Sequence, residues 1–406
     1  MKVEERFLEY VKFDTQSDEH SQTTPSSLKQ LKLAEYLVDE MKRIGIEDAY
    51  VDEFGIVYGS IPANVADELP VIGFIAHMDT SPDMSGKDIK PRIVKCYDGS
   101  RIILNEELGI SMSPEEFECL YEKKGEDLIV TDGTTLLGAD DKAGIAEIMT
   151  MAESLLSNKY PHGCIKLAFT PDEEVGRGTD HFNVKNFGAD FAYTVDGGEV
   201  ESVDYENFNA ASADIEIQGL SIHPGSAKGK MLNATLIGME FHSMLPVEQN
   251  PAYTEGYEGF NHLIEFNGEC EHASMSYIIR NHDEVLFEKQ KDDFKRIAEY
   301  LNKKYPENTI SLNIKDSYSN MRMIIEKDMS IIELVKKSMK EIGIEPISNA
   351  IRGGTDGARL TYDGLPCPNL GTGGYNYHGK YEFVSINEMN KSVELLLKIV
   401  ENSLSL

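Results

Sequence analysis

The stretch VIGFIAHMD at residues 71–79 is a short apolar run followed at once by a histidine and an acid. Two further runs repeat the pattern, since IKLAFT at 165–170 precedes PDEE and FAYTV at 191–195 precedes DGG. Uninterrupted apolar runs of this length, bounded by turn-forming residues, are typical of strands buried on both faces of a sheet. We therefore expect three buried strands whose ends carry polar side chains.

Helical patterns accompany these runs. Residues 142–156 (KAGIAEIMTMAESLL) lie between the first and second runs, and residues 28–44 carry apolar positions at helical spacing with Gly45 just beyond as a stop. A strand, helix, strand order predicts an α/β domain, here with a mixed, mainly parallel sheet flanked by helices.

The middle of the chain has a different pattern. It alternates as strand, helix, two strands, helix and strand, at residues 213–220, 233–245, 262–280, 285–304 and 309–314. This β-α-β-β-α-β order is a compact α+β unit. We predict that it forms an inserted domain at residues 208–317, which interrupts a discontinuous domain made of residues 1–207 and 318–406.

Composition limits the possible functions. A chain of 406 residues exceeds the about 250–300 residues that one core usually serves, which agrees with two domains. The 70 acidic and 39 basic residues give a net charge of −31, which repels phosphate backbones and anionic lipid, so we expect neither nucleic-acid nor membrane binding. The acidic start lacks a signal peptide and the five scattered cysteines form no CxxC pair, so we expect a cytoplasmic protein with reduced thiols.

Metal-binding residue types follow each buried run. His77, Glu174 and Asp196 come directly after or close to the ends of the three strands, and the carboxyl ends of parallel strands meet at one edge of a sheet. Asp140 precedes a helix and His378 lies in a glycine-rich loop. Three carboxylates and a bridging hydroxide balance the charge of two divalent ions, so we predict a two-metal site in which Asp140 bridges.

Two acids beside these ligands have other predicted roles. Glu173 is adjacent to Glu174 and projects differently, which leaves it free as the general base. Asp79, two residues after His77, is placed to orient a metal-bound imidazole. Each motif alone has an ordinary structural explanation, since glutamate pairs are often solvated and Asp140 could be a helix cap. The prediction depends on the whole arrangement.

Several segments together resemble the peptidase T family of co-catalytic zinc peptidases, over essentially the whole chain. They are HMDT at 77–80, LLGADDKAGIAEIM at 136–149, FTPDEEVGRG at 169–178, VDGG at 195–198, SIHPGSAKGKMLNA at 221–234, IRGGTDGARL at 351–360 and YNYHG at 375–379. The resemblance implies an aminopeptidase that releases the N-terminal residue of tripeptides by attack of a metal-bridging hydroxide, with two divalent ions, taken to be zinc, and Glu173 as base.

The resemblance also implies roles that the residues alone do not. The peptide bond after Asp140 is expected to be cis, and the inserted domain is expected to serve as a lid and as the interface of a homodimer. His223 would stabilise the tetrahedral oxyanion. Contacts to the short peptide substrate are expected from Arg280, Arg352 and Asn233.

Other functions remain open at this point. The same two-metal site would serve a dipeptidase, a carboxypeptidase or an amide deacylase, and a protein of this fold could also keep its metals without catalysis. A free base at Glu173 argues against the last of these. The imidazole and carboxylate ligands suit zinc, cobalt or manganese.

Overall fold

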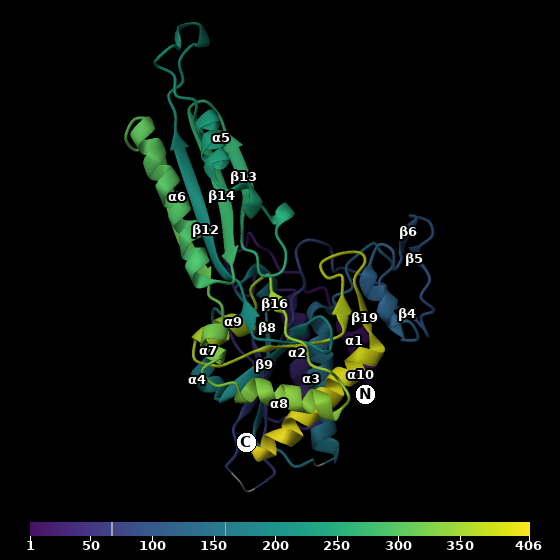
Figure 1. The fold of residues 1–406 in the computed structure, drawn as a ribbon. Coiled ribbons are helices and arrows are strands. Elements are labelled where there is room, and N and C mark those ends of the chain that lie inside the picture. The colour runs from purple at the N-terminus through teal and green to yellow at the C-terminus, as the bar shows by residue number, and fades with distance from the viewer. Residues whose placement is uncertain (66–67, 159) are drawn as a thin grey trace. The chain divides into compact units, whose positions relative to one another are not determined.

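The computed structural model describes residues 1–65, 68–158 and 160–406, and the chain divides into two compact units (Figure 1). The first unit is made of Met1–Tyr205, Met323–Asn349 and Thr355–Leu406. The second is made of Glu206–Arg322 and Ala350–Gly354. The first unit is therefore built from three separate parts of the chain.

A seven-stranded sheet forms the centre of the first unit, in the order β1-β2-β8-β3-β9-β17-β10. Its middle strands β8 (Ile165–Thr170), β3 (Ile72–His77) and β9 (Phe191–Gly197) are parallel. This confirms the three buried strands and shows that their carboxyl ends lie at the same edge of the sheet. β17 (Asn369–Gly371) continues the parallel order. The antiparallel outer strands, which make the sheet mixed, are β1 (Tyr50–Val51), β2 (Val57–Ile61) and β10 (Val203–Asp204).

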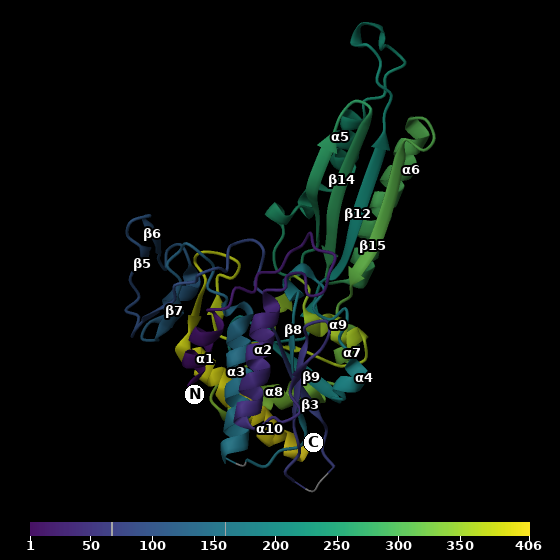
Figure 2. The ribbon, with the colours of Figure 1, turned by 180° about the vertical axis from the view of Figure 1, so that it is seen from behind.

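Helices flank this sheet (Figure 2). α3 (Ala139–Asn158) contacts β3 and β9 and is covered in turn by α1 and α10, so most of its described side chains are buried. α2 ends at Gly45, whose φ of 110° is the left-handed conformation that the predicted glycine stop supplies. The helices of the first unit are α1 (Val3–Tyr10), α2 (Gln30–Ile44), α3, α4 (Val184–Phe187), α8 (Ser330–Glu341), α9 (Asp356–Tyr362) and α10 (Ile386–Asn402), with α7 (Arg322–Ile325) at the junction between the units.

The first unit also contains short strands that the sequence did not indicate. A four-stranded sheet has the order β18-β19-β7-β4, and a β5-β6 hairpin lies between β4 and β7 along the chain. The glycine-rich tail was expected to form loops, but it contains α9, β17 and β18. β17 and β18 have only three and two residues, too few to show a periodicity, and α9 has only seven. These strands are β4 (Arg92–Val94), β5 (Ile102–Asn105), β6 (Ile110–Met112), β7 (Leu128–Val130), β18 (Gly374–Tyr375) and β19 (Phe383–Ser385).

The second unit confirms the β-α-β-β-α-β order. Its antiparallel sheet has the order β13-β14-β12-β15, and α5 and α6 pack on it around a core that includes Ile215, Phe241 and Phe294. Its elements are β11 (Glu206–Asn207), β12 (Asn209–Gln218), α5 (Ala234–Met244), β13 (Phe260–Gly268), β14 (His272–Asn281), α6 (Glu284–Lys304), β15 (Ile310–Tyr318) and β16 (Ala350–Ile351). No helix in the described ranges is both long and apolar enough to cross a membrane.

Candidate active site

His77 is the last residue of β3 and is almost fully buried. Its Nδ1 lies 3.0 Å from the backbone oxygen of Asp79 and 3.3 Å from the Asp79 carboxylate. Its Nε2 faces two other carboxylates, at 2.8 Å from Asp140 and 3.4 Å from Asp196. An imidazole whose one nitrogen is fixed by oxygen acceptors while the other faces carboxylates has the arrangement of a metal ligand.

Asp140 lies at the start of α3 with a non-helical backbone, and the peptide bond to Asp141 is cis, as the resemblance implied. Its two carboxylate oxygens face different histidines. Oδ1 is 2.8 Å from Nε2 of His77, and Oδ2 is 3.1 Å from Nε2 of His378. His378 itself lies in the connection between β18 and β19. Asp140 therefore stands between the two imidazoles.

Two groups of potential metal ligands share Asp140. The first is His77, Asp140 and Asp196, the second is Asp140, Glu174 and His378, and within each group the ligand atoms lie within 4.8 Å of one another. Oε2 of Glu174 is 3.0 Å from Nε2 of His378, while the buried Oε1 of Glu174 has no hydrogen-bond partner among the described residues. An orphaned carboxylate oxygen among imidazole and carboxylate donors fits divalent ions such as zinc.

Burial and hydrogen bonding shift the pKa values of several of these groups. Burial raises the pKa of Glu174 to about 7 and that of Asp196 to about 6. Hydrogen bonds to Asp140 and Glu174 raise the pKa of His378 to about 11. A positive charge bound among these buried carboxylates would favour their ionised forms.

Glu173 and Glu174 lie in a short 3-10 turn directly after β8. The Asp79 carboxylate accepts both of their backbone N–H groups, at 3.0 and 3.2 Å. Asp172, whose φ is 59°, accepts from Gln30 Nε2 at 2.7 Å and so holds the other end of the turn. The Glu173 carboxyl makes no hydrogen bond or ion pair with any described side chain, and burial raises its pKa well above the usual range.

The other predicted site residues belong to the second unit. Arg280 donates to the backbone oxygens of Ala211 and Ile279 and lies over the ring of Tyr318, and Arg352 donates to the oxygens of Gly256 and Glu258. The structure thus gathers His77, Asp79, Asp140, Glu173, Glu174, Asp196 and His378 within the first unit.

Asn233 and His223, in the same second unit, both use their side chains locally. Asn233 caps α5 by accepting from Leu236 N at 3.1 Å. His223 is exposed, and its Nδ1 accepts from Gly225 N at 3.1 Å.

Two further acids belong to the site, Asp172 and Glu382, to which the sequence pattern had assigned no role. Asp172 precedes the glutamate pair and could have been found from its position in PDEE. Glu382 could not, because its role depends on four backbone N–H groups more than 240 residues away in sequence, from Leu137 to Asp140.

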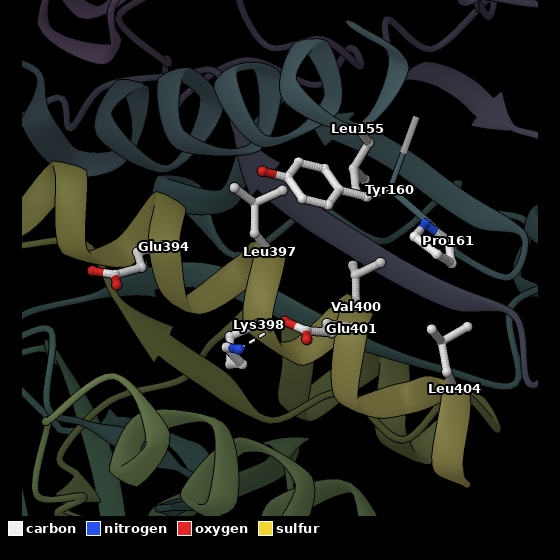
Figure 3. A pocket seen from close by; sticks show the side chains of 9 residues that line it. All are labelled: Leu155, Tyr160, Pro161, Glu394, Leu397, Lys398, Val400, Glu401 and Leu404. Atoms are coloured by element: carbon white, nitrogen blue, oxygen red, sulfur yellow. Dashed lines mark hydrogen bonds and ion pairs between the residues drawn. The ribbon is translucent and has the colours of Figure 1, made fainter. Parts of the chain in front are cut away.

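A cavity of about 380 Å³ lies between the last turns of α3 and α10 (Figure 3). Its walls are mainly apolar, with one ion pair in which Lys398 lies 2.7 Å from Glu401. No candidate ligand lines it. The residues around it are Leu155, Tyr160, Pro161, Glu394, Leu397, Lys398, Val400, Glu401 and Leu404.

Residues 131–402 match the model of peptidase family M20/M25/M40. The chain is 57% identical over 401 residues to peptidase T of Caldanaerobacter subterraneus subsp. tengcongensis and 55% identical over 401 residues to peptidase T of Clostridium perfringens, with 98% of both chains covered in each case. The chain belongs to the M20 peptidase family. This confirms the family resemblance. The protein is therefore a hydrolase, and its family is one of dinuclear metal peptidases.

Solved structures confirm the fold of this M20 peptidase. Aminopeptidase PepT from Bacillus cereus has a TM-score of 0.79 at 23% identity and covers 99% of this chain and 98% of its own. A tripeptidase from Staphylococcus aureus has a TM-score of 0.78 at 22% identity, with 100% and 98% covered. A dinuclear metal-binding M20 peptidase from Bacillus subtilis has a TM-score of 0.61 at 12% identity, with 98% of both covered. The α/β catalytic fold with an inserted α+β domain is common to them.

Proposed function

We propose that this M20 peptidase releases the N-terminal residue from tripeptides at a site that binds two zinc ions. The observation that carries the proposal is the pair of three-ligand groups that share Asp140. His77 and Asp196 would hold one ion, Glu174 and His378 the other, and Asp140 would bridge them. Two such ions, when bound, polarise a carbonyl and lower the pKa of the water between them.

Glu173 is the proposed general base. Its carboxyl has no other described partner and its pKa is raised by burial, so it can take a proton from the attacking water and deliver it to the leaving amine. The Asp79 carboxylate fixes the turn that carries Glu173 and also holds His77, so one side chain supports both the base and a ligand.

The tripeptide substrate is supported by the names of relatives. Two relatives above 50% identity are called peptidase T, and one protein of the same fold is called a tripeptidase. In this proposal His223 stabilises the oxyanion, because its Nδ1 accepts a hydrogen bond and its Nε2 then carries the proton that can be donated. Arg280, Arg352 and Asn233 are proposed to contact the peptide.

Three matched substrates test this function. Purified enzyme loaded with zinc is incubated with a tripeptide, its N-acetylated form and the dipeptide that lacks the third residue, and the products are identified. We expect release of the first residue from the free tripeptide and little cleavage of the other two. Equal cleavage of the acetylated peptide would contradict an aminopeptidase and favour a deacylase or carboxypeptidase, and preference for the dipeptide would favour a dipeptidase.

A homodimer through the second unit is also proposed. On the single chain, α5 exposes Leu236, Met239 and Met244, and Ile264 is exposed on the edge strand β13, which α5 contacts. Apolar surface of this kind marks protein interfaces. Light scattering should give twice the chain mass, and Met239→Glu should shift the measured mass toward that of the monomer.

The cytoplasm is the proposed compartment of this protein. Its five free cysteines support this, because disulfides are rare in reducing compartments.

A further inference from the structure

Glu382 is a buried carboxylate whose hydrogen-bond partners among the described residues are all backbone N–H groups, those of Asp140 and the three residues before it. Oε2 accepts the N–H groups of Leu137 at 2.6 Å and Gly138 at 2.9 Å. Oε1 accepts those of Ala139 at 2.6 Å and Asp140 at 3.2 Å. The side chain is 1% exposed. Four successive N–H groups therefore converge on one carboxylate.

Such convergence is more than ordinary helix capping. A capping side chain usually accepts one N–H near the first turn, whereas this carboxylate engages the three residues before Asp140 and Asp140 itself. Both oxygens are used, so the peptide planes of residues 137–140 are fixed in position and in rotation. A buried carboxylate is costly unless hydrogen bonds satisfy it, and here the backbone satisfies both of its oxygens.

The segment that Glu382 binds, residues 137–140, ends at Asp140, whose two carboxylate oxygens face different histidines. Asp140 directs Oδ1 toward His77 and Oδ2 toward His378, so a small rotation of its backbone would move both oxygens away from their partners. Glu382 follows His378 by four residues in sequence, and its carboxylate binds the backbone of residues 137–140. One short stretch, residues 378–382, thus carries a candidate ligand and also the anchor of the bridging residue.

We infer that Glu382 is a positioning residue, which fixes the backbone of residues 137–140 so that Asp140 can bridge two metal ions. The inference rests on the proposed two-metal function. It assigns Glu382 no contact with substrate or with the ions. Loss of its carboxylate should weaken metal binding by about 10- to 100-fold, as is usual for groups that orient metal ligands.

Cobalt(II) is a suitable probe, since its visible absorption reports its coordination. Metal-free wild type, Glu382→Gln, Glu382→Asp and Glu147→Gln are each titrated with cobalt against a competing chelator. The amide of Glu382→Gln turns an NH₂ group toward N–H donors and should lower affinity and alter the spectrum. Glu382→Asp keeps an acceptor-only carboxylate and should recover part of the affinity. Glu147, equally buried and on α3, has no partner among the ligands, so Glu147→Gln should bind cobalt like wild type.

The outcomes separate the inference from the function on which it rests. Wild type that fails to bind two cobalt ions per chain contradicts the proposed function. Wild type that binds two, with a folded Glu382→Gln of unchanged affinity and spectrum, overturns the positioning role. If Glu382→Gln does not fold, Glu382→Asp decides in the same way, with weaker binding supporting the role and wild-type binding overturning it. At saturating metal, a lower kcat with unchanged KM for the tripeptide is also expected.

Discussion

Two adjacent glutamates differ in what their carboxyls face. Glu174 points at His378, at 3.0 Å, whereas Glu173 has no described hydrogen-bond partner for its carboxyl. The difference arises from a short turn that begins after the left-handed Asp172 and is held by Asp79. One dipeptide can therefore supply both a ligand and a base.

Replacing the base should separate catalysis from metal binding. Glu173→Ala is expected to lower kcat for tripeptide hydrolysis by at least about 10²–10⁴-fold, the usual contribution of a positioned acid–base group. Elemental analysis should still find two metal ions per chain, because Glu173 belongs to neither ligand group. Loss of both ions in this variant would mean that Glu173, rather than Glu174, is a ligand.

Glu147 gives a prediction about pH and stability. It is buried on α3, its Oε2 accepts a hydrogen bond from Ser392 at 2.5 Å, and its Oε1 has no hydrogen-bond partner in the part of the chain that the structure describes. Burial raises its pKa well above the usual range, so the folded state holds the proton that the unfolded chain releases near its ordinary pKa of about 4.3. Below that pH both states are protonated and nothing is lost; above it the unfolded chain ionises and the wild type loses stability until its folded pKa is reached.

Glu147→Gln removes this proton equilibrium. The free energy of unfolding of the variant, minus that of wild type, should therefore rise in favour of the variant between about pH 5 and pH 7. Urea unfolding of both proteins at the two pH values measures the change. A difference that stays constant with pH would show that Glu147 is ionised in the folded protein.

At the scale of elements, the approach of α3 to β9 sets the spacing of the site. Gly144 faces the carbonyl of Val195 so closely that an added methyl group would overlap its oxygen. Asp140 is the second residue of α3 and Asp196 follows Val195 in β9, so this contact links the elements of two candidate ligands. Only glycine permits it.

Gly144→Ala should push the helix away from the strand. We expect a loss of about 1–3 kcal/mol in the free energy of unfolding, the usual cost of overpacking, together with weaker metal binding. Urea unfolding and cobalt titration measure the two effects. Unchanged values in both would mean that the helix can shift without disturbing the ligands.

Strands and helices with clear periodicity were predictable, and so was the gathering of side chains at the strand ends. The apolar runs before His77, Glu173 and Asp196 identified β3, β8 and β9 because buried strands need continuous apolar residues. β17 and β18 were missed because they are too short to show a pattern. Glu382 was missed because a carboxylate that binds distant backbone N–H groups leaves no local signal in sequence.

At the scale of the molecule, the candidate ligands join segments that are far apart in sequence. His77, Asp140, Glu174, Asp196 and His378 come from five places along the first unit. An ion that binds the folded state stabilises it by about 2.7 kcal/mol when its free concentration is 100 times Kd.

Chelation should therefore lower the thermal unfolding midpoint, and added zinc should restore it. Differential scanning calorimetry with and without chelator measures the shift. Asp140→Asn, which weakens the shared ligand, should lose most of it. A midpoint that does not respond to chelator in wild type would contradict ions that bridge these segments.

The discontinuity of the first unit has a consequence for biosynthesis. Four of the five candidate ligands precede residue 197, while His378 and its neighbour Glu382 come after the whole of the second unit. During translation the first four candidate ligands are therefore made well before His378 and Glu382. If these residues form the proposed site, a nascent chain that has not yet reached residue 382 should not hydrolyse peptides.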